Sequence, residues 1–230
     1  MSGPRIAYVL GTSSGGTGAH VAMLAAGCAA RGATVTVYGP ASAGERFFTS
    51  TGEPKGRAAV WTDERGGEGA GARREDGGLE RSGGERGPER AVAFEPVEIA
   101  GRVRPARDAA AVLRLRRLLR RAEPGVVHAH GLRAGALAAA ALSLAARPRP
   151  ALLVTVHNAP PAGRTSGLVY GLLERVIARR ADAVTWVSGD LAARLRRLGA
   201  RDGGRALVPA PPGPAPTPAQ AAAARAGLGG

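Results

Sequence analysis

The sequence predicts an α/β fold in which a parallel sheet carries helices on both faces. Two observations lead to this prediction: short apolar runs have the composition of strands, and most stretches between them repeat their apolar residues at helical spacing. Strands that alternate with helices favour a parallel sheet, because each crossover returns along one face of it. Such sheets bind ligands beyond the carboxyl ends of their strands.

Six segments and a seventh candidate have the composition of strands. The first is RIAYVL, and the seventh candidate is the short ALVP segment late in the chain. In chain order they are residues 5–10, 34–38, 93–99, 125–130, 151–157, 183–188 and 206–209.

Helical periodicity fills most of the intervals between these strands. The first helix has apolar residues at i, i+3, i+4 and i+7, and Gly32 is well placed to end it. A second apolar stripe stops at Pro124, and the alanine-rich run at 134–146 is predicted to be a packed helix. Two more helices are predicted at about 166–180 and 189–198. The two stripes are Val21, Leu24, Ala25 and Cys28, and Val112, Leu115, Leu119 and Ala122.

Two segments break the alternation and set the predicted domain boundaries. An insertion at about 53–91 is dense in acids and arginines and has almost no apolar residues, so we expect it to be disordered. Residues 209–230 begin as a proline-rich linker. We therefore expect one domain at 1–208, followed by a linker toward a second domain.

Composition bounds the cellular setting and the partners. The formal net charge of +14 is almost entirely arginine, since Lys55 is the single lysine. With aromatic residues at only 3%, the chain offers few platforms for stacking bases, and we expect no nucleic-acid partner. The single cysteine, Cys28, fits a reducing compartment and is predicted to be buried filler. No secretory leader is recognisable, so a cytoplasmic location is expected, with peripheral contact to a membrane left open.

A glycine-rich turn leads from the first strand into the first helix. It lies in VLGTSSGGTGAHV at 9–21, where backbone N–H groups could approach a phosphate, although ordinary loops also contain such glycines. A dinucleotide site would need a G-x-G-x-x-G motif and an acid at the end of the second strand, which reads VYGP at 37–40. A P-loop would need a lysine that this turn lacks.

All four histidines follow or end predicted strands at one edge of the sheet. His20 lies just after the glycine turn, His128 and His130 end the fourth strand, and His157 ends the fifth. Since the carboxyl ends of parallel strands share an edge, we expect these side chains to form a site. The spacing of His128 and His130 also suits zinc, but no carboxylate lies near them in sequence. No metal and no cofactor are therefore expected.

Four motifs in order carry a resemblance to a known family. They are GGTGAHV (15–21), VVHAHG (126–131), VTVHN (154–158) and RRADAVTWVS (179–188). Together they resemble the N-terminal half of the family-four retaining glycosyltransferases, which have the GT-B fold of two facing Rossmann-like domains. The resemblance covers most of residues 5–209.

The resemblance implies roles for individual residues. Gly15 and Gly16 would approach the diphosphate of a nucleotide-sugar donor, and His157 would lie near the transferred sugar as the catalytic histidine. His130 would line the cleft. His20 and Asn158 would contact acceptor or donor.

The family pattern continues beyond the part that this chain matches. In the family, the C-terminal domain neutralises the leaving diphosphate and binds the nucleobase, so we expect this chain alone to be a fragment with little or no activity. Two alternatives stay open. The domain could bind an acceptor or partner without catalysis, or the arginines at 114–121 and 194–197 could attach it to an anionic membrane.

Overall fold

The computed structural model describes residues 3–12, 15–49, 92–143, 148–157 and 164–208. The predicted insertion at 53–91 and the predicted linker at 209–230 lie outside this part of the chain, so their boundaries stay predictions. Asn158 also lies outside it.

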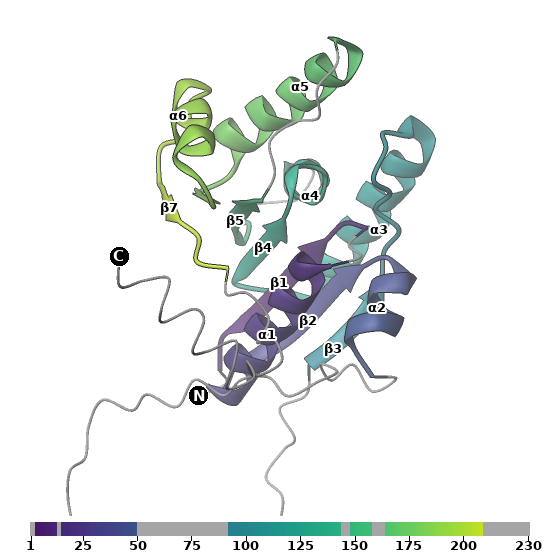
Figure 1. The fold of residues 1–230 in the computed structure, drawn as a ribbon. Helices are drawn as coiled ribbons and strands as arrows, with labels where there is room; N and C mark the ends of the chain where they lie inside the picture. Colours follow the sequence, from purple (N-terminus) through teal and green to yellow (C-terminus); the bar gives the residue numbers. More distant parts are fainter. Residues whose placement is uncertain (1–2, 13–14, 50–91, 144–147, 158–163, 209–230) are drawn as a thin grey trace, which may run out of the picture.

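The described residues form a seven-stranded parallel sheet in the order β3-β2-β1-β4-β5-β6-β7 (Figure 1). Every neighbouring pair is parallel. The predicted fold class is therefore confirmed. The strands are β1 (Arg5–Leu10), β2 (Thr34–Gly39), β3 (Val92–Pro96), β4 (Val126–His130), β5 (Ala151–Val156), β6 (Ala183–Trp186) and β7 (Gly203–Arg205).

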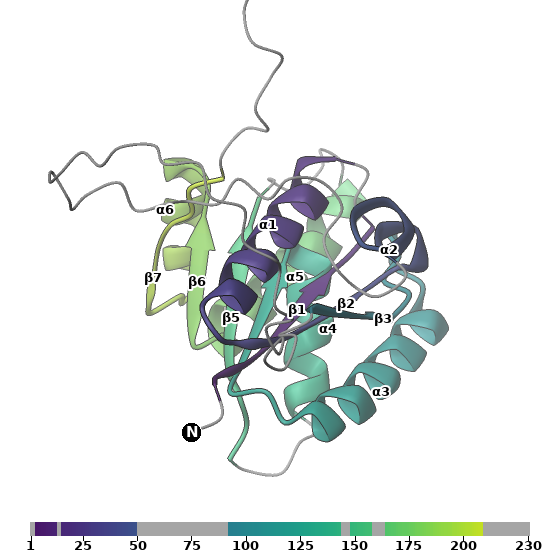
Figure 2. The same ribbon diagram turned by 90° about the horizontal axis from the view of Figure 1, so that it is seen from below.

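Helices cover both faces of the sheet, as predicted. One apolar cluster joins α1 and α2 to β1 and β2, and Figure 2 shows α1 in front of the strands. A larger cluster packs four other helices against the opposite face. The helices are α1 (Gly16–Ala30), α2 (Ala41–Phe47), α3 (Pro105–Ala122), α4 (Leu132–Ser143), α5 (Arg164–Arg180) and α6 (Gly189–Arg197).

Local sequence explains where α3 begins and ends. Pro105 occupies its first turn, where a missing N–H costs no helical hydrogen bond. Glu123 then ends the helix in the left-handed conformation, with φ of 43°, and Pro124 follows. The predicted stop at Pro124 is thus two residues from Ala122, the observed end of α3.

Two short elements differ from the prediction. Residues 206–208 of the predicted strand at 206–209 do not form a strand. The seventh strand is instead β7, Gly203–Arg205, which has no apolar side chain. Glycine at position 203 permits this pairing, because a Cβ there would clash with the Val184 carbonyl of β6. Helix α2 was not predicted, since seven residues are too few for a recognisable period.

The pleat of β4 sends its side chains to opposite faces of the sheet. Val127 and Ala129 join the larger apolar cluster, while His128 and His130 lie on the face that carries α1. His130 pairs with Leu10 of β1 and Thr155 of β5 near the carboxyl ends of these strands. Of the described helices, none is both long and apolar enough to cross a membrane.

Candidate functional site

The glycine turn places an open helix N-terminus at the carboxyl edge of β1. Gly15 precedes the first residue of α1, Gly16, and both are exposed. A Cβ at either position would meet nothing within 4 Å. The N-cap residue Gly15 has no side chain to cap α1, and the first turn of this helix holds no acid. The exposed backbone at Gly15 and Gly16 and the positive end of the helix dipole make this turn suited to an anion.

Gly18 of the same turn is required for helix packing. A Cβ at Gly18 would lie 2.1 Å from the ring of Phe47, so the missing side chain lets α1 pack against α2. The turn therefore combines two open glycines with one that packing requires.

The four histidines come together, as their positions on the strands predicted. His20 of α1 meets the ring of His130 edge-on, with 5.7 Å between ring centroids. His157, directly after β5, stacks on His130 at 5.4 Å. His128 lies 4.2 Å from His130 by ring centroids. His130 is thus the centre of the cluster.

Hydrogen bonds fix the cluster to the sheet. His130 Nδ1 and His157 Nε2 are 3.1 Å apart, with one proton shared between them. His128 Nε2 lies 2.7 Å from the Thr155 hydroxyl, which itself lies 2.7 Å from the hydroxyl of Thr185. The chain from His128 through Thr155 to Thr185 crosses β4, β5 and β6, so the His128 ring is held by the neighbouring strands.

Two nitrogens of the cluster lack hydrogen-bond partners. Within the described part of the chain, His20 Nδ1 and His130 Nε2 are buried and have no partner. Buried polar atoms are nearly always hydrogen-bonded in folded proteins, since leaving one unsatisfied costs about 1–3 kcal/mol. A ligand that presents hydroxyl groups would satisfy both nitrogens.

Burial keeps the cluster uncharged. Desolvation lowers the pKa of His128 and of His157 to about 4, and the other histidines contribute further to the lowering. The pKa of His130 falls well below its usual value for the same reasons, and that of His20 is lowered by burial. At neutral pH the site therefore presents neutral imidazoles, which can both donate and accept hydrogen bonds.

The cation nearest in sequence to His130 is already paired. Arg133 follows in the first turn of α4, where it is buried and bonds to Asp108 at 2.5 Å and to the Ala100 carbonyl at 2.6 Å. Gly131, with φ of 88°, makes the turn between β4 and α4. Arg133 thus joins α3 to α4 rather than presenting a free charge to the histidines.

The structure brings together His20, His130 and His157, and it places Gly15 and Gly16 at the start of the helix that carries His20. The hydrogen bond from His128 to Thr155 was not predicted, although the alternation of His128 and His130 along one strand signals a shared face. Thr155 gave no signal, because a threonine in a strand is ordinary. No group of three or more His, Cys, Asp or Glu side chains that could hold a metal ion occurs in the described ranges.

Sequence comparison decides the family. Residues 15–211 match the family model described as the glycosyl transferase 4-like domain. The chain belongs to this family. No curated protein matches the chain.

Solved structures share the fold of this glycosyl transferase 4-like domain. UDP-N-acetylglucosamine 2-epimerase from Rickettsia bellii aligns with a TM-score of 0.52 and 10% identity, covering 88% of this chain and 44% of that one. Sucrose-phosphate synthase from Thermosynechococcus elongatus aligns with a TM-score of 0.51 and 15% identity, covering 90% and 48%. The chain spans less than half the length of either structure. Identities this low establish the shared Rossmann-like fold alone.

Proposed function

We propose that this chain forms the acceptor-side half of a glycosyltransferase, which moves a sugar from a nucleotide-sugar donor to an acceptor. The observation that carries the proposal is the cluster of neutral histidines, with two unsatisfied buried nitrogens, on the helix and strands beside an open helix N-terminus. Sugars present many hydroxyl groups, and nucleotide-sugars present a diphosphate, so the two features match the two parts of one donor molecule.

The donor diphosphate would bind at Gly15 and Gly16. Their open approach lets an oxygen atom reach the backbone N–H groups, and the helix dipole favours negative charge there. A diphosphate is also the leaving group of the transfer, so the same amides would stabilise the charge that develops as the glycosidic bond breaks.

His157 would contact the transferred sugar or the acceptor hydroxyl. If the His130 Nδ1–H donates to His157 Nε2, the neutral His157 carries its proton on Nδ1 and can donate it to a sugar oxygen. The same tautomer leaves His130 Nε2 as a buried acceptor for a hydroxyl proton. The opposite tautomer exchanges donor and acceptor at these two atoms.

A second domain would complete the site. The chain covers less than half of the two similar structures, and the described cluster is neutral, so we infer that cations for the leaving diphosphate come from a facing domain. A retaining outcome and a cytoplasmic location rest on the family resemblance and on composition, and both stay predictions.

The experiment is the substitution His157→Ala in an enzyme that contains this domain and its facing domain. Transfer of labelled sugar, assayed with a panel of nucleotide-sugars, should fall by at least about a hundredfold in kcat/KM, the usual contribution of a positioned acid–base group. Diphosphate binding at the glycine turn should be retained, which controls for misfolding. Unchanged turnover in the variant would refute the role given to His157.

A further inference from the structure

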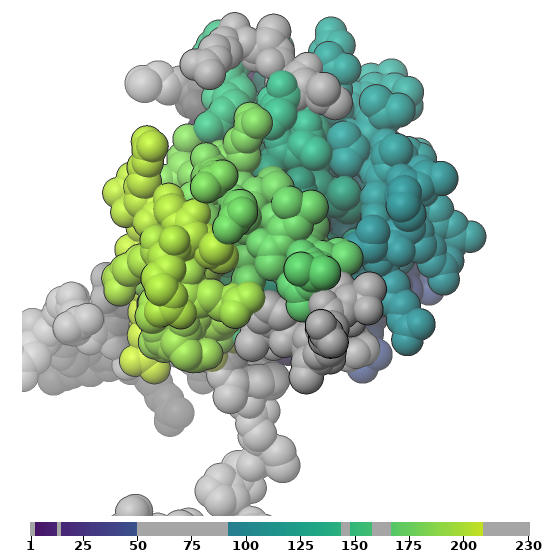
Figure 3. Space-filling view, turned by 90° about the horizontal axis from the view of Figure 1, so that it is seen from above, coloured from purple at the N-terminus to yellow at the C-terminus, as the bar shows by residue number. Residues whose placement is uncertain are grey.

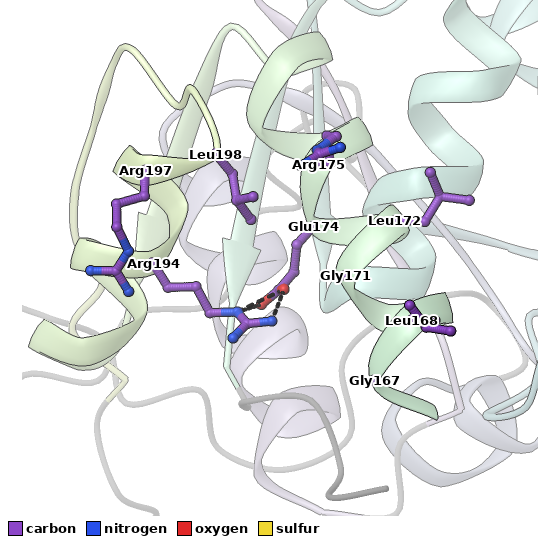
Figure 4. A pocket seen from close by; sticks show the side chains of 9 residues that line it. All are labelled: Gly167, Leu168, Gly171, Leu172, Glu174, Arg175, Arg194, Arg197 and Leu198. Atoms are coloured by element: carbon purple, nitrogen blue, oxygen red, sulfur yellow. Dashed lines mark hydrogen bonds and ion pairs between the residues drawn. The ribbon is translucent and has the colours of Figure 1, made fainter. Parts of the chain in front are cut away.

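A groove lies between α5 and α6, apart from the histidine cluster. Its volume is about 450 Å³, and Figure 4 shows side chains of both helices along it. The space-filling view in Figure 3 shows the two helices side by side on one face of the molecule. We call this feature the α5–α6 groove, and its lining side chains include Leu168, Leu172, Leu198, Arg175, Arg194 and Arg197.

One wall of the α5–α6 groove is an exposed apolar ridge. Leu168 is 79% exposed and Leu172 is 61% exposed, and they lie one helical turn apart on α5. A Cβ at Gly167 or Gly171 beside them would meet nothing within 4 Å, so the two leucines lie on an open surface. Large apolar side chains this exposed on neighbouring turns are typical of a surface that meets a partner.

The charge of the groove is positive. Its carboxylate, Glu174, is fully buried and accepts two hydrogen bonds from Arg194, at 2.7 and 2.8 Å. The negative charge of the lining is therefore already paired. Arg175 and Arg197 are exposed, and no acid of the lining is left to pair with them.

We propose that the α5–α6 groove is a binding surface for an anionic membrane. Exposed leucines reach the boundary between headgroups and acyl chains, while arginines bind lipid phosphates. A second copy of the chain would bring arginines against arginines, because the lining charges that remain unpaired are of one sign. The lining has no aromatic side chain to stack bases, which disfavours nucleic acid.

The α5–α6 groove is related to the histidine cluster by its position, but the membrane proposal does not depend on the function of that cluster. Helix α5 begins soon after His157, so Leu168 and Leu172 lie in the half of α5 nearest the carboxyl edge of the sheet. A membrane at this groove would bring a lipid-borne acceptor to the same edge as the histidines. The binding itself requires no catalysis, so failure of the proposed transfer activity would leave the membrane proposal standing.

Vesicle co-sedimentation of the full chain tests the proposal. Vesicles of phosphatidylcholine with phosphatidylglycerol should bind the chain, and pure phosphatidylcholine should bind it far less. The double variants Leu168→Ser/Leu172→Ser and Arg175→Gln/Arg197→Gln should each weaken binding about tenfold or more. Far-UV circular dichroism checks that the variants fold.

The arginine-rich helix α3 provides a matched control. Arg117→Gln/Arg120→Gln removes the same charge, and Leu113→Ser removes an exposed leucine from the same face of α3. These variants should change binding by less than about threefold. Equal losses from both helices would overturn the proposal in favour of diffuse attraction. Equal binding to neutral and anionic vesicles would also overturn it. The same holds if the groove variants lose only self-association, or only binding to the acidic polymer polyglutamate, while vesicle binding is unchanged.

Discussion

At the scale of single residues, the central feature is a histidine held neutral by its surroundings. His130 is buried among His20, His128 and His157, and each positive charge in this group would repel the others. Desolvation and this repulsion act in the same direction, because both disfavour the protonated form. Neutral rings suit hydroxyl groups better than phosphates, which is why the two ends of a nucleotide-sugar are assigned to different parts of the site.

Proton titration of the ring resonances checks this account. We expect His128 and His157 to titrate near pH 4, and we expect the pKa of His130 to lie well below its usual value of 6.5. Because unfolded histidines gain protons at about pH 6.5, the folded state should lose stability progressively as pH falls from about 6.5 toward 4. Nuclear magnetic resonance of the Cε1–H signals gives the values directly. Titration of His130 near 6.5 would show that the cluster is open to water.

At the scale of elements, α1 serves both parts of the site. Its first turn offers the open glycines, and His20 reaches the cluster from the next turn. The helix is held in place by close packing on α2, where Gly18 faces Phe47. The position of the N-terminus of α1 thus depends on the contact between Gly18 and Phe47.

The substitutions Gly18→Ala and Gly16→Ala separate packing from function. Gly18→Ala forces its methyl group into Phe47 and should destabilise the chain by about 1–3 kcal/mol, measured by urea unfolding. Gly16→Ala meets nothing and replaces a glycine within a helix, so stability should stay the same or rise. Equal destabilisation by both would contradict the distinction between the two glycines.

At the scale of the whole molecule, most of the fold could be predicted from the sequence. The alternation of apolar strands and helical stripes fixed six strands within a few residues and placed α1, α3, α4, α5 and α6. The misses share a physical cause. Both β7 and α2 are short and are held by tertiary contacts. Local composition does not predict contacts with residues that are distant in sequence.

The candidate site was also predicted only in part from the sequence. Parallel topology predicts that His20, His130 and His157 meet, because strand ends share an edge. The hydrogen bond between His130 and His157, and the support of His128 by Thr155, depend on which rings face one another, and sequence spacing does not give that. Of the α5–α6 groove, the sequence indicated only the arginine-rich stretch at 194–197, because the exposed Leu168 and Leu172 lie on a different helix.

The central claim is that the glycine turn holds the diphosphate of a nucleotide-sugar beside the histidines. The most direct measurement titrates UDP, GDP and pyrophosphate into the isotopically labelled chain and follows its backbone amide resonances. The account predicts saturable shifts at Gly15 and Gly16 with all three ligands, weakened by Gly16→Ala, which leaves the fold intact. Shifts confined to the arginine-rich helices, with Gly15 and Gly16 unmoved, would contradict it.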